Sequence, residues 1–363
     1  MAIRITATIF ILFYRSRGAF FTVIELRFIN SFVSLIFAIY IIYKNRSYSL
    51  AAHKSHANLQ IKLIFYNVTG GYLRMFQMFH HIEKANNIRY ENYLPLHHRM
   101  GQIGWIKRQH ISVFEHFTDL FECDGKNIYL LPGLPGLPGR DQALLLEEKM
   151  LEFAQFLHDR DYLLGWWGEK YRLTTGWHDQ EITTIERGLT PFLGAKSWGV
   201  HLNGYLKTQG KLFLWVAKRS MSKRNDPGKL DNIVAGGQPA GLSLRENLAK
   251  EAAEEAGISS AMIASARAAG VLSYVTEMTY GVKQDQIFVY DLEVQESFIP
   301  KAIDGEVEAF QLMEAEEILE ILATSDAFKY NCALVYLDFF IRHGILTADN
   351  CADYIETCLG LHH

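Results

Sequence analysis

The sequence predicts a mixed α/β protein: an α/β sandwich in the C-terminal half, preceded by a smaller α/β domain. The chain has 363 residues, of which 49% are hydrophobic and 21% charged, so it can bury more than one core. From residue 196 onward, stretches that alternate apolar and polar residues are interleaved with helical stretches, which indicates layered packing. In the same half, a glycine-rich loop at 236–241 runs into a helix rich in carboxylates, and this is the feature that points to a function.

The composition argues against a nucleic-acid partner and against a zinc site. The formal net charge is -4, whereas nucleic-acid binding needs a strongly basic, clustered surface. The cysteines lack the paired spacing of zinc ligands, so we expect free thiols in a reducing cytoplasm. Nothing in the sequence indicates an oligomeric state. The cysteines are Cys123, Cys332, Cys351 and Cys358.

Residues 1–74 form an apolar extension, with apolar runs at 5–14 and 28–43. The second run covers about sixteen residues, slightly short of the roughly 20 that span a bilayer. Three interpretations stay open: a membrane anchor through 28–43, an apolar hairpin packed on the body, and sequence upstream of a true start near Met75 or Met78. We favour the third, and we expect membrane contact only if the extension is part of the protein.

The region 79–195 is predicted to form the small α/β domain. A triple Leu-Pro-Gly repeat at 131–139 predicts a loop, because proline and glycine at this density break regular structure. Trp166 and Trp167 could stack on an aromatic ligand, although burial in a core or domain interface is the more frequent role. We expect helices at 80–87, 111–121 and 141–160, strands at 102–108, 127–131 and 169–174, and a break at 93–96.

The region 196–363 is predicted to form the sandwich. A basic cluster at the end of its second strand, Lys218, Arg219, Lys223 and Arg224, is either a solvated rim or a phosphate clamp. We expect strands at 198–205, 211–219, 269–274, 286–294 and 305–312, and helices at 315–323 and 327–342.

The carboxylate-rich helix is predicted to hold a metal ion. Ser243 followed by Glu246 predicts a capping box at its start. At 100° per residue, Glu251, Glu254 and Glu255 span about 100° of the helix surface, so we expect them to project outward as one cluster. Like charges on one face repel each other and weaken the helix. The alternative to a metal site is an ordinary solvated helix that is rich in glutamate. Hard carboxylate ligands suit Mg²⁺ or Mn²⁺. We expect Ala249, Ala253 and Ala256 to pack against the sheet.

The segment Lys-Glu-Ala-Ala-Glu-Glu-Ala-Gly-Ile at 250–258 resembles the second half of the Nudix box, with lysine in place of arginine. Gly236 stands at the first glycine of that box. Leu242 stands where the box has its first glutamate, and we expect a pair between Glu246 and Lys250 to take over that residue's supporting role. The likeness covers about 79–345. It extends to the segments 165–171, 185–187, 199–205, 230–237, 246–248, 304–308 and 331–335, which resemble a subfamily related to the Nudix part of fungal thiamine pyrophosphokinase.

This resemblance implies a Nudix α/β/α sandwich with a mixed sheet. It further implies Mg²⁺-dependent hydrolysis of an organic diphosphate, namely thiamine diphosphate or its oxidised analogues, to the monophosphate and phosphate. Glu251, Glu254, Glu255 and the Gly236 carbonyl would hold the Mg²⁺ ion, or Mn²⁺ in its place. The ion would neutralise diphosphate charge and lower the pKa of a water. Glu251 or Glu306 would be the base, and a simple exposed strand residue is the alternative for Glu306.

Four further residues are candidates for substrate binding. Arg219 and Lys229 would clamp phosphate, because both lie close to the glycine-rich loop in sequence. Trp198 or Trp215 could stack on a heteroaromatic ring, although core packing is the more frequent role of a tryptophan.

Three other functions compete with this one. A Nudix hydrolase of ADP-ribose or another nucleoside diphosphate derivative would use the same box. A diphosphate isomerase would need a protonating cysteine near the loop, and Ala235 with no neighbouring cysteine argues against it. A non-catalytic diphosphate-binding module would be expected to have lost the glutamates, and they are present.

Overall fold

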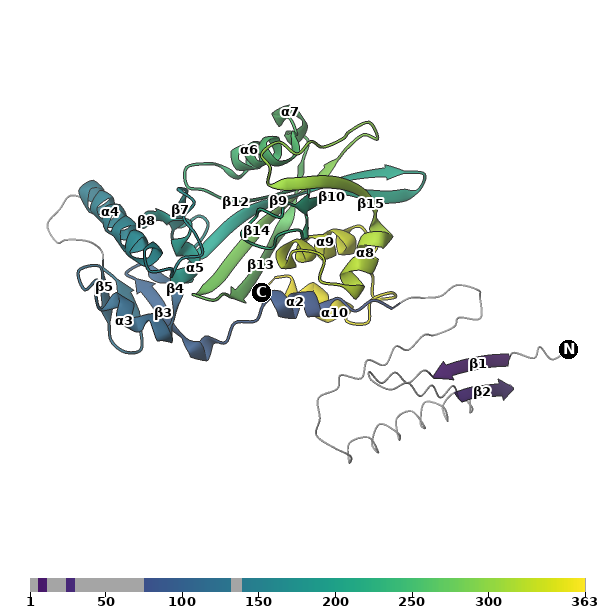
Figure 1. Ribbon diagram of the computed structural model, residues 1–363, viewed down its shortest axis with the longest axis horizontal. Coiled ribbons are helices and arrows are strands. Elements are labelled where there is room, and N and C mark those ends of the chain that lie inside the picture. The colour runs from purple at the N-terminus through teal and green to yellow at the C-terminus, as the bar shows by residue number, and fades with distance from the viewer. Residues whose placement is uncertain (1–5, 12–23, 30–74, 132–138, 363) are drawn as a thin grey trace. The chain divides into compact units, whose positions relative to one another are not determined.

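The protein is described here from a computed structural model, which divides the chain into two compact units, Met1–Ile64 and Phe65–His363. Figure 1 shows the described residues as ribbon, and these are residues 6–11, 24–29, 75–131 and 139–362.

In the first unit, β1 (Thr6–Ile11) and β2 (Ile24–Ile29) pair antiparallel. Most of the apolar run at 28–43 lies outside the described residues, as does most of the Leu-Pro-Gly repeat. Among the helices of the described ranges, none is long and apolar enough to cross a membrane.

The second unit begins with α2 (Phe79–Ala85) and the small α/β domain. Four strands form one sheet in the order β4-β3-β6-β5, in which β3 and β6 run parallel. Aromatic rings fill the core under it: Phe114 contacts Phe121 at 4.8 Å and Phe153 at 5.5 Å between ring centroids. The elements are β3 (Tyr93–His98), β4 (Gly101–Lys107), α3 (Ile111–Phe114), β5 (Phe121–Cys123), β6 (Ile128–Leu130), α4 (Gly139–His158), the hairpin β7 (Lys170–Leu173) and β8 (Thr183–Glu186), and α5 (Leu189–Leu193).

Two expectations in this domain are wrong. Residues 93–96 do not break the chain but lie in β3, and Pro95 is tolerated there because the neighbouring strand β6 pairs only with Leu96 and His97. The helix expected at 111–121 ends at Phe114, since the residues after it turn into β5. The strand β8 was not expected at all.

The sandwich is built on a seven-stranded sheet in the order β11-β10-β9-β14-β13, with β12 beside β9 and β15 beside β10. β9 and β14 run parallel, whereas the other neighbours are antiparallel, so the sheet is mixed, as predicted. The strands are β9 (Lys196–Thr208), β10 (Lys211–Arg219), β11 (Leu230–Asp231), β12 (Val234–Gly237), β13 (Arg267–Glu277), β14 (Val282–Glu293) and β15 (Val307–Glu314).

Helices cover both faces of this sheet (Figure 1). Along β14, Ile287 and Val289 pack into the core beneath α9, while Tyr290 and Leu292 pack into the core beneath α6. This alternation is what a strand buried on both sides requires. The predicted α/β sandwich is therefore confirmed. One face carries α6 (Leu244–Ala256) and α7 (Ser260–Ile263), and the other carries α8 (Ala315–Thr324), α9 (Tyr330–Arg342), α10 (Tyr354–Gly360) and α2.

The predicted capping box of α6 is confirmed. The Ser243 hydroxyl accepts the Glu246 amide at 3.3 Å, and the Glu246 carboxylate accepts the Ser243 amide at 2.9 Å. We expect Ser243→Ala to destabilise the protein by about 1 kcal/mol, the usual effect of losing an N-cap. The measurement is the shift of the urea midpoint. Ser260→Ala, at an exposed position in the first turn of α7, is the control, and an equal shift in both variants would contradict the capping role.

Candidate active site

The buried face of α6 is set by Leu248, Ala252 and Ala256, spaced four residues apart. Ala253 is exposed, so the expectation that it packs against the sheet is wrong. The reason is helix geometry. Because Leu248, Ala252 and Ala256 form the buried face, the side chain of Ala253, the next residue after Ala252, points toward solvent. The same geometry separates the three glutamates, and they do not project outward as one cluster.

Glu255 lies inside the buried stripe and is itself buried. Its Oε2 atom accepts the backbone amide of Ala235 at 2.9 Å, which ties α6 to β12. Burial raises the pKa of Glu255 to about 8, and the negative charges of Asp231, Glu251 and Glu306 add to this. The Ala235 hydrogen bond opposes the shift only in part.

Glu251 is partly buried against Gly236. A Cβ atom at Gly236 would lie 2.3 Å from Glu251 Cδ, so a larger residue there would force this carboxylate to move. Lys250 bridges Glu251 and the exposed Glu254, with Nζ–O distances of 3.1 and 3.0 Å. Burial also raises the pKa of Glu251. The structure thus brings Gly236 and Glu251 into direct contact, as the box requires.

Glu306 lies in the loop before β15. It forms an ion pair with Lys223, and its backbone carbonyl accepts the Ser220 amide at 2.8 Å. Its charge contributes to the raised pKa of Glu255, so the two carboxylates are electrostatic neighbours.

These carboxylates fit a divalent cation. Glu255 and Glu251 are both withdrawn from water, and the charge of Glu251 helps to raise the pKa of Glu255. Buried carboxylates are costly without a positive charge nearby, and oxygen atoms are the ligands that Mg²⁺ and Mn²⁺ prefer. Gly236, which has no side chain to fill the space, keeps the approach open.

A second group of ligand-type side chains, His201, Asp231 and Cys332, is buried nearby, with one ligand atom of each within 4.8 Å of the others. Asp231 is already paired with Arg219 at 2.7 Å and Lys329 at 3.8 Å, and it accepts the Cys332 thiol at 2.5 Å. Burial alone would raise the pKa of Asp231, but the positive charges of Lys329 and Arg219 lower this pKa to about 2. Two cations at this carboxylate would repel a metal ion, so the group is better described as a buried ion-pair network.

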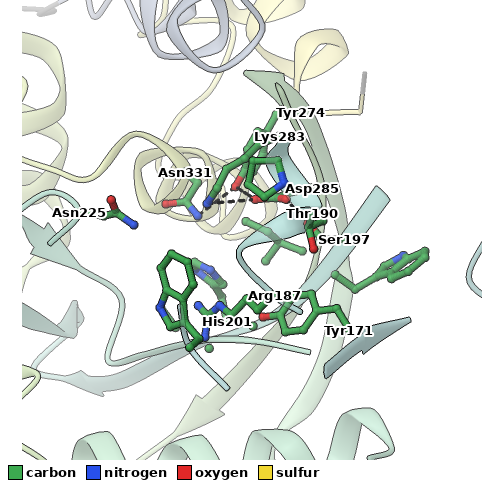
Figure 2. Close-up of a pocket in the computed structure, with 18 of the residues that line it drawn as sticks. Tyr171, Arg187, Thr190, Ser197, His201, Asn225, Tyr274, Lys283, Asp285 and Asn331 are labelled. Atoms are coloured by element: carbon green, nitrogen blue, oxygen red, sulfur yellow. Dashed lines mark hydrogen bonds and ion pairs between the residues drawn. The ribbon is translucent and has the colours of Figure 1, made fainter. Parts of the chain in front are cut away.

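A pocket opens beside the carboxylates and is lined by both the small domain and the sandwich (Figure 2). Tyr171 on β7 approaches β12 so closely that a Cβ atom at Gly237 would lie 1.7 Å from the tyrosine hydroxyl oxygen. The small domain therefore forms one wall of the pocket. The wall includes Trp167, Tyr171, Arg187 and Thr190 from the small domain, and Trp198, Gly236, Gly237, Lys283, Asp285 and Lys329 from the sandwich.

Two family models match the chain: DUF4743, a domain of unknown function, over residues 77–197, and the NUDIX domain over residues 204–333. The chain is 41% identical over 255 residues to Nudix hydrolase 20, chloroplastic, of Arabidopsis thaliana, an alignment that covers 68% of this chain and 67% of that protein. The chain belongs to the Nudix hydrolase family. It is also 34% identical over 250 residues to Nudix hydrolase 24, chloroplastic, of the same plant, again covering 68% and 67%. An uncharacterized protein of Saccharomyces cerevisiae, YJR142W, is 36% identical over 212 residues, which cover 54% of this chain and 61% of that protein.

The Nudix box departs from its usual pattern at Leu242, and the structure supports the loop in an unexpected way. Lys250 pairs with Glu251 and Glu254, while the Glu246 carboxylate bonds to Ser243, so the expected pair between Glu246 and Lys250 is wrong. Instead, buried Asn247 donates to the Gly237 carbonyl at 2.8 Å. Gln238 similarly donates to the Leu242 carbonyl at 2.7 Å. Amide side chains hold the loop of this Nudix protein.

The predicted phosphate clamps lie outside the pocket. Arg219 donates to Asp231 and to the carbonyls of Asn225 and Asp226 at 2.9 and 3.1 Å. Lys229 donates to the Asp326 carbonyl at 2.9 Å. Both side chains are thus occupied by contacts within the protein, and the geometry favours other cations for this role.

Of the two tryptophan candidates, Trp198 lines the pocket and Trp215 does not. Trp198 is held by a hydrogen bond from Nε1 to Gln286 at 2.8 Å. Trp215 packs with the core beneath α6, edge-on to Phe298 at 6.3 Å.

Sequence reasoning missed Arg187, Lys283 and Lys329, which all line the pocket. Lys283 and Lys329 stand in no motif, so only the fold could reveal them. Arg187 lies in the segment 185–187, which resembles the thiamine-related subfamily, and that resemblance was the one signal that could have singled it out.

Proposed function

We propose that this protein hydrolyses an organic diphosphate in a Mg²⁺-dependent reaction, and that its substrate is thiamine diphosphate or an oxidised analogue. The products would be the monophosphate and phosphate. One observation carries the proposal: Glu251 lies against Gly236 and Glu255 accepts the Ala235 amide, beside a pocket that also contains Arg187 and Lys283. An acidic cluster beside basic side chains suits a metal ion together with a diphosphate.

In this proposal Glu251, Glu254, Glu255 and the Gly236 carbonyl would hold the Mg²⁺ ion, and Mn²⁺ could replace it. The ion would supply neutralisation of phosphate charge and a lowered pKa of water. Glu251 accepts the proton of the attacking water, because a carboxylate whose pKa is raised by burial is the better base near neutral pH. Glu306 is the alternative base. The bond between phosphorus and the bridging oxygen breaks as the water oxygen attacks.

The organic group would lie against aromatic side chains. Trp198 lines the pocket together with Trp167 from the small domain. Flat indole rings suit a heteroaromatic group, since offset stacking of aromatic rings is favourable. Thiamine has such rings, and the resemblance to thiamine-related Nudix proteins is the reason for proposing it ahead of ADP-ribose. The domain division at about residue 195 is part of this proposal, as is a cytoplasmic location, which free cysteines suit.

The test is to incubate the full chain and Mg²⁺ separately with thiamine diphosphate, oxythiamine diphosphate and ADP-ribose, and to measure phosphate and monophosphate release. We expect release from the two thiamine compounds, abolished by chelation of the metal, and little from ADP-ribose. Faster turnover of ADP-ribose would favour the nucleoside diphosphate alternative. Inactivity on all three compounds, with folding verified by circular dichroism, would contradict the thiamine proposal.

A further inference from the structure

Three cations lie together in the pocket, and the metal site uses none of them. Arg187 follows β8, Lys283 lies in β14, and Lys329 is the N-cap residue of α9. Burial lowers the pKa of Lys283, and the positive charges of Lys329 and Arg187 lower it further, although Asp285 opposes this. Lys329 and Arg187 are thus electrostatic neighbours of Lys283 in the same pocket, and an anion bound there would relieve their repulsion of Lys283.

Arg187 is held in place but has donors to spare. Its Nη1 atom donates to Glu169 at 2.7 Å, and its guanidinium lies over the rings of Trp167 and Tyr171 at 5.5 and 5.6 Å. Within the described part of the chain, Nε and Nη2 have no hydrogen-bond acceptor. A guanidinium that is fixed on one edge and free on the other suits the planar recognition of phosphate oxygens.

Lys283 is likewise not saturated. Its Nζ atom lies 3.8 Å from Asp285, too far for a hydrogen bond. The Asp285 carboxylate is already occupied, because it accepts the hydroxyls of Ser197 and of Tyr274, the latter at 2.6 Å. Figure 2 shows Lys283 and Asp285 in one group and Arg187 with Tyr171 in another.

Thr190 gives an independent indication that the pocket takes a polar ligand. Thr190 lines the pocket, and its buried hydroxyl has no hydrogen-bond partner among residues 75–131 and 139–362. A buried hydroxyl without a partner is costly, and a ligand oxygen would satisfy it.

Arg187 also stands at the junction between the basic and acidic halves of the site. Its Cζ atom lies 3.6 Å from where a Cβ atom of Gly237 would be, one residue from Gly236. The Glu251 side chain lies against Gly236, so the guanidinium and this carboxylate lie beside neighbouring residues of β12. A ligand that spans both halves must carry a metal ion at one end and negative charge at the other.

We propose that Arg187, supplied by the small N-terminal domain, binds the phosphate next to the metal carboxylates, and that Lys283 binds the other phosphate of the same diphosphate. The N-terminal domain then completes the active site rather than merely preceding it. The inference rests on the proposed function for its ligand class, and a binding measurement separates the two.

The experiment measures binding of methylenediphosphonate, a non-hydrolysable diphosphate, with Mg²⁺ to the full chain by calorimetry. We expect Arg187→Gln to raise the Kd about ten- to hundredfold, the range for losing hydrogen bonds to a charged group. Lys170→Gln is the matched control, since Lys170 carries a positive charge on the same hairpin but pairs with Glu147 outside this pocket. A Kd of Arg187→Gln within about twofold of the wild type, or an equal loss in the control, would overturn the proposal.

Lys283→Gln provides a second test that does not disturb the Arg187–Glu169 pair. If Arg187→Gln fails to fold, an unchanged Kd for Lys283→Gln overturns the proposal, and a rise of about tenfold or more supports it. If only the proposed function is wrong, the wild type will bind the probe through Arg187 but will release no phosphate from thiamine diphosphate. Conversely, normal turnover in Arg187→Gln overturns the inference and leaves the proposed function standing.

Discussion

Replacing Glu255 by glutamine will lower kcat/KM by about 10²–10³-fold, since loss of metal-assisted charge stabilisation amounts to several kcal/mol and each tenfold is about 1.4 kcal/mol. Glutamine keeps the shape of the side chain and can still accept the Ala235 amide. The substitution therefore removes the charge while leaving the bond between α6 and β12. Steady-state kinetics of phosphate release is the measurement.

A structural role and a metal-binding role predict different stabilities for Glu255→Gln. Burial and three like charges raise the pKa of Glu255, so the charged form of this side chain is unfavourable in the folded protein. Removing the charge should therefore not lower the melting temperature of the metal-free protein. Mg²⁺ at about 100 times its Kd should stabilise the wild type by about 2.7 kcal/mol and the variant much less. Glu317→Gln, an exposed glutamate of α8, is the control and should behave as the wild type. Equal stabilisation of both proteins by Mg²⁺ would remove Glu255 from the metal site.

Gly236→Ala is expected to reduce kcat by about 100-fold, because a displacement of about 1 Å at a reacting group can have this effect. A methyl group at Gly236 would lie 2.3 Å from Cδ, 2.4 Å from Cγ and 2.5 Å from Oε2 of Glu251. Contacts this short cannot persist, so the carboxylate must turn away. The strand itself should survive, since alanine is compatible with the antiparallel pairing of β12 and β9.

A double-mutant comparison tests whether Gly236→Ala acts through Glu251. If it does, the variant that combines Gly236→Ala with Glu251→Ala will be no less active than Glu251→Ala alone. Additive losses would mean that the methyl group blocks the substrate or the backbone carbonyl instead. Circular dichroism of each variant separates either outcome from unfolding.

Much of the sandwich could be predicted because residues close together in the sequence determine its helices and strands. Alternating apolar and polar residues predicted β10, β14 and β15, and the apolar spacing of α8 and α9 predicted two helices on one face of the sheet. Ser243 and Glu246 marked the start of α6 through a contact within one turn. The nine residues at 250–258 identified the family, since the glutamates of that motif recur within a single helix.

The environment of each glutamate could not be predicted in the same way. Helical phase gives the angles between Glu251, Glu254 and Glu255, but which angle is buried depends on where α6 meets β12 and β9. The packing of α6 on β12 buries Glu255, which accepts the Ala235 amide, and leaves Glu254 exposed to solvent. Gly236 was expected in a loop and lies in a strand, because β9 is long enough to pair with it.

The local sequence was sufficient to mark the candidate acidic residues, because they lie mainly on one helix and in the segment that leads into it. The basic half depended on the tertiary structure. Arg187, Lys283 and Lys329 come from three elements that are far apart in sequence, and no spacing connects them. They converge because β14 runs parallel to β9 and the small domain packs its β7–β8 hairpin against β12. Long-range pairing of this kind leaves no periodic trace in the chain, so the folded structure alone could reveal the basic wall of the pocket in this Nudix protein.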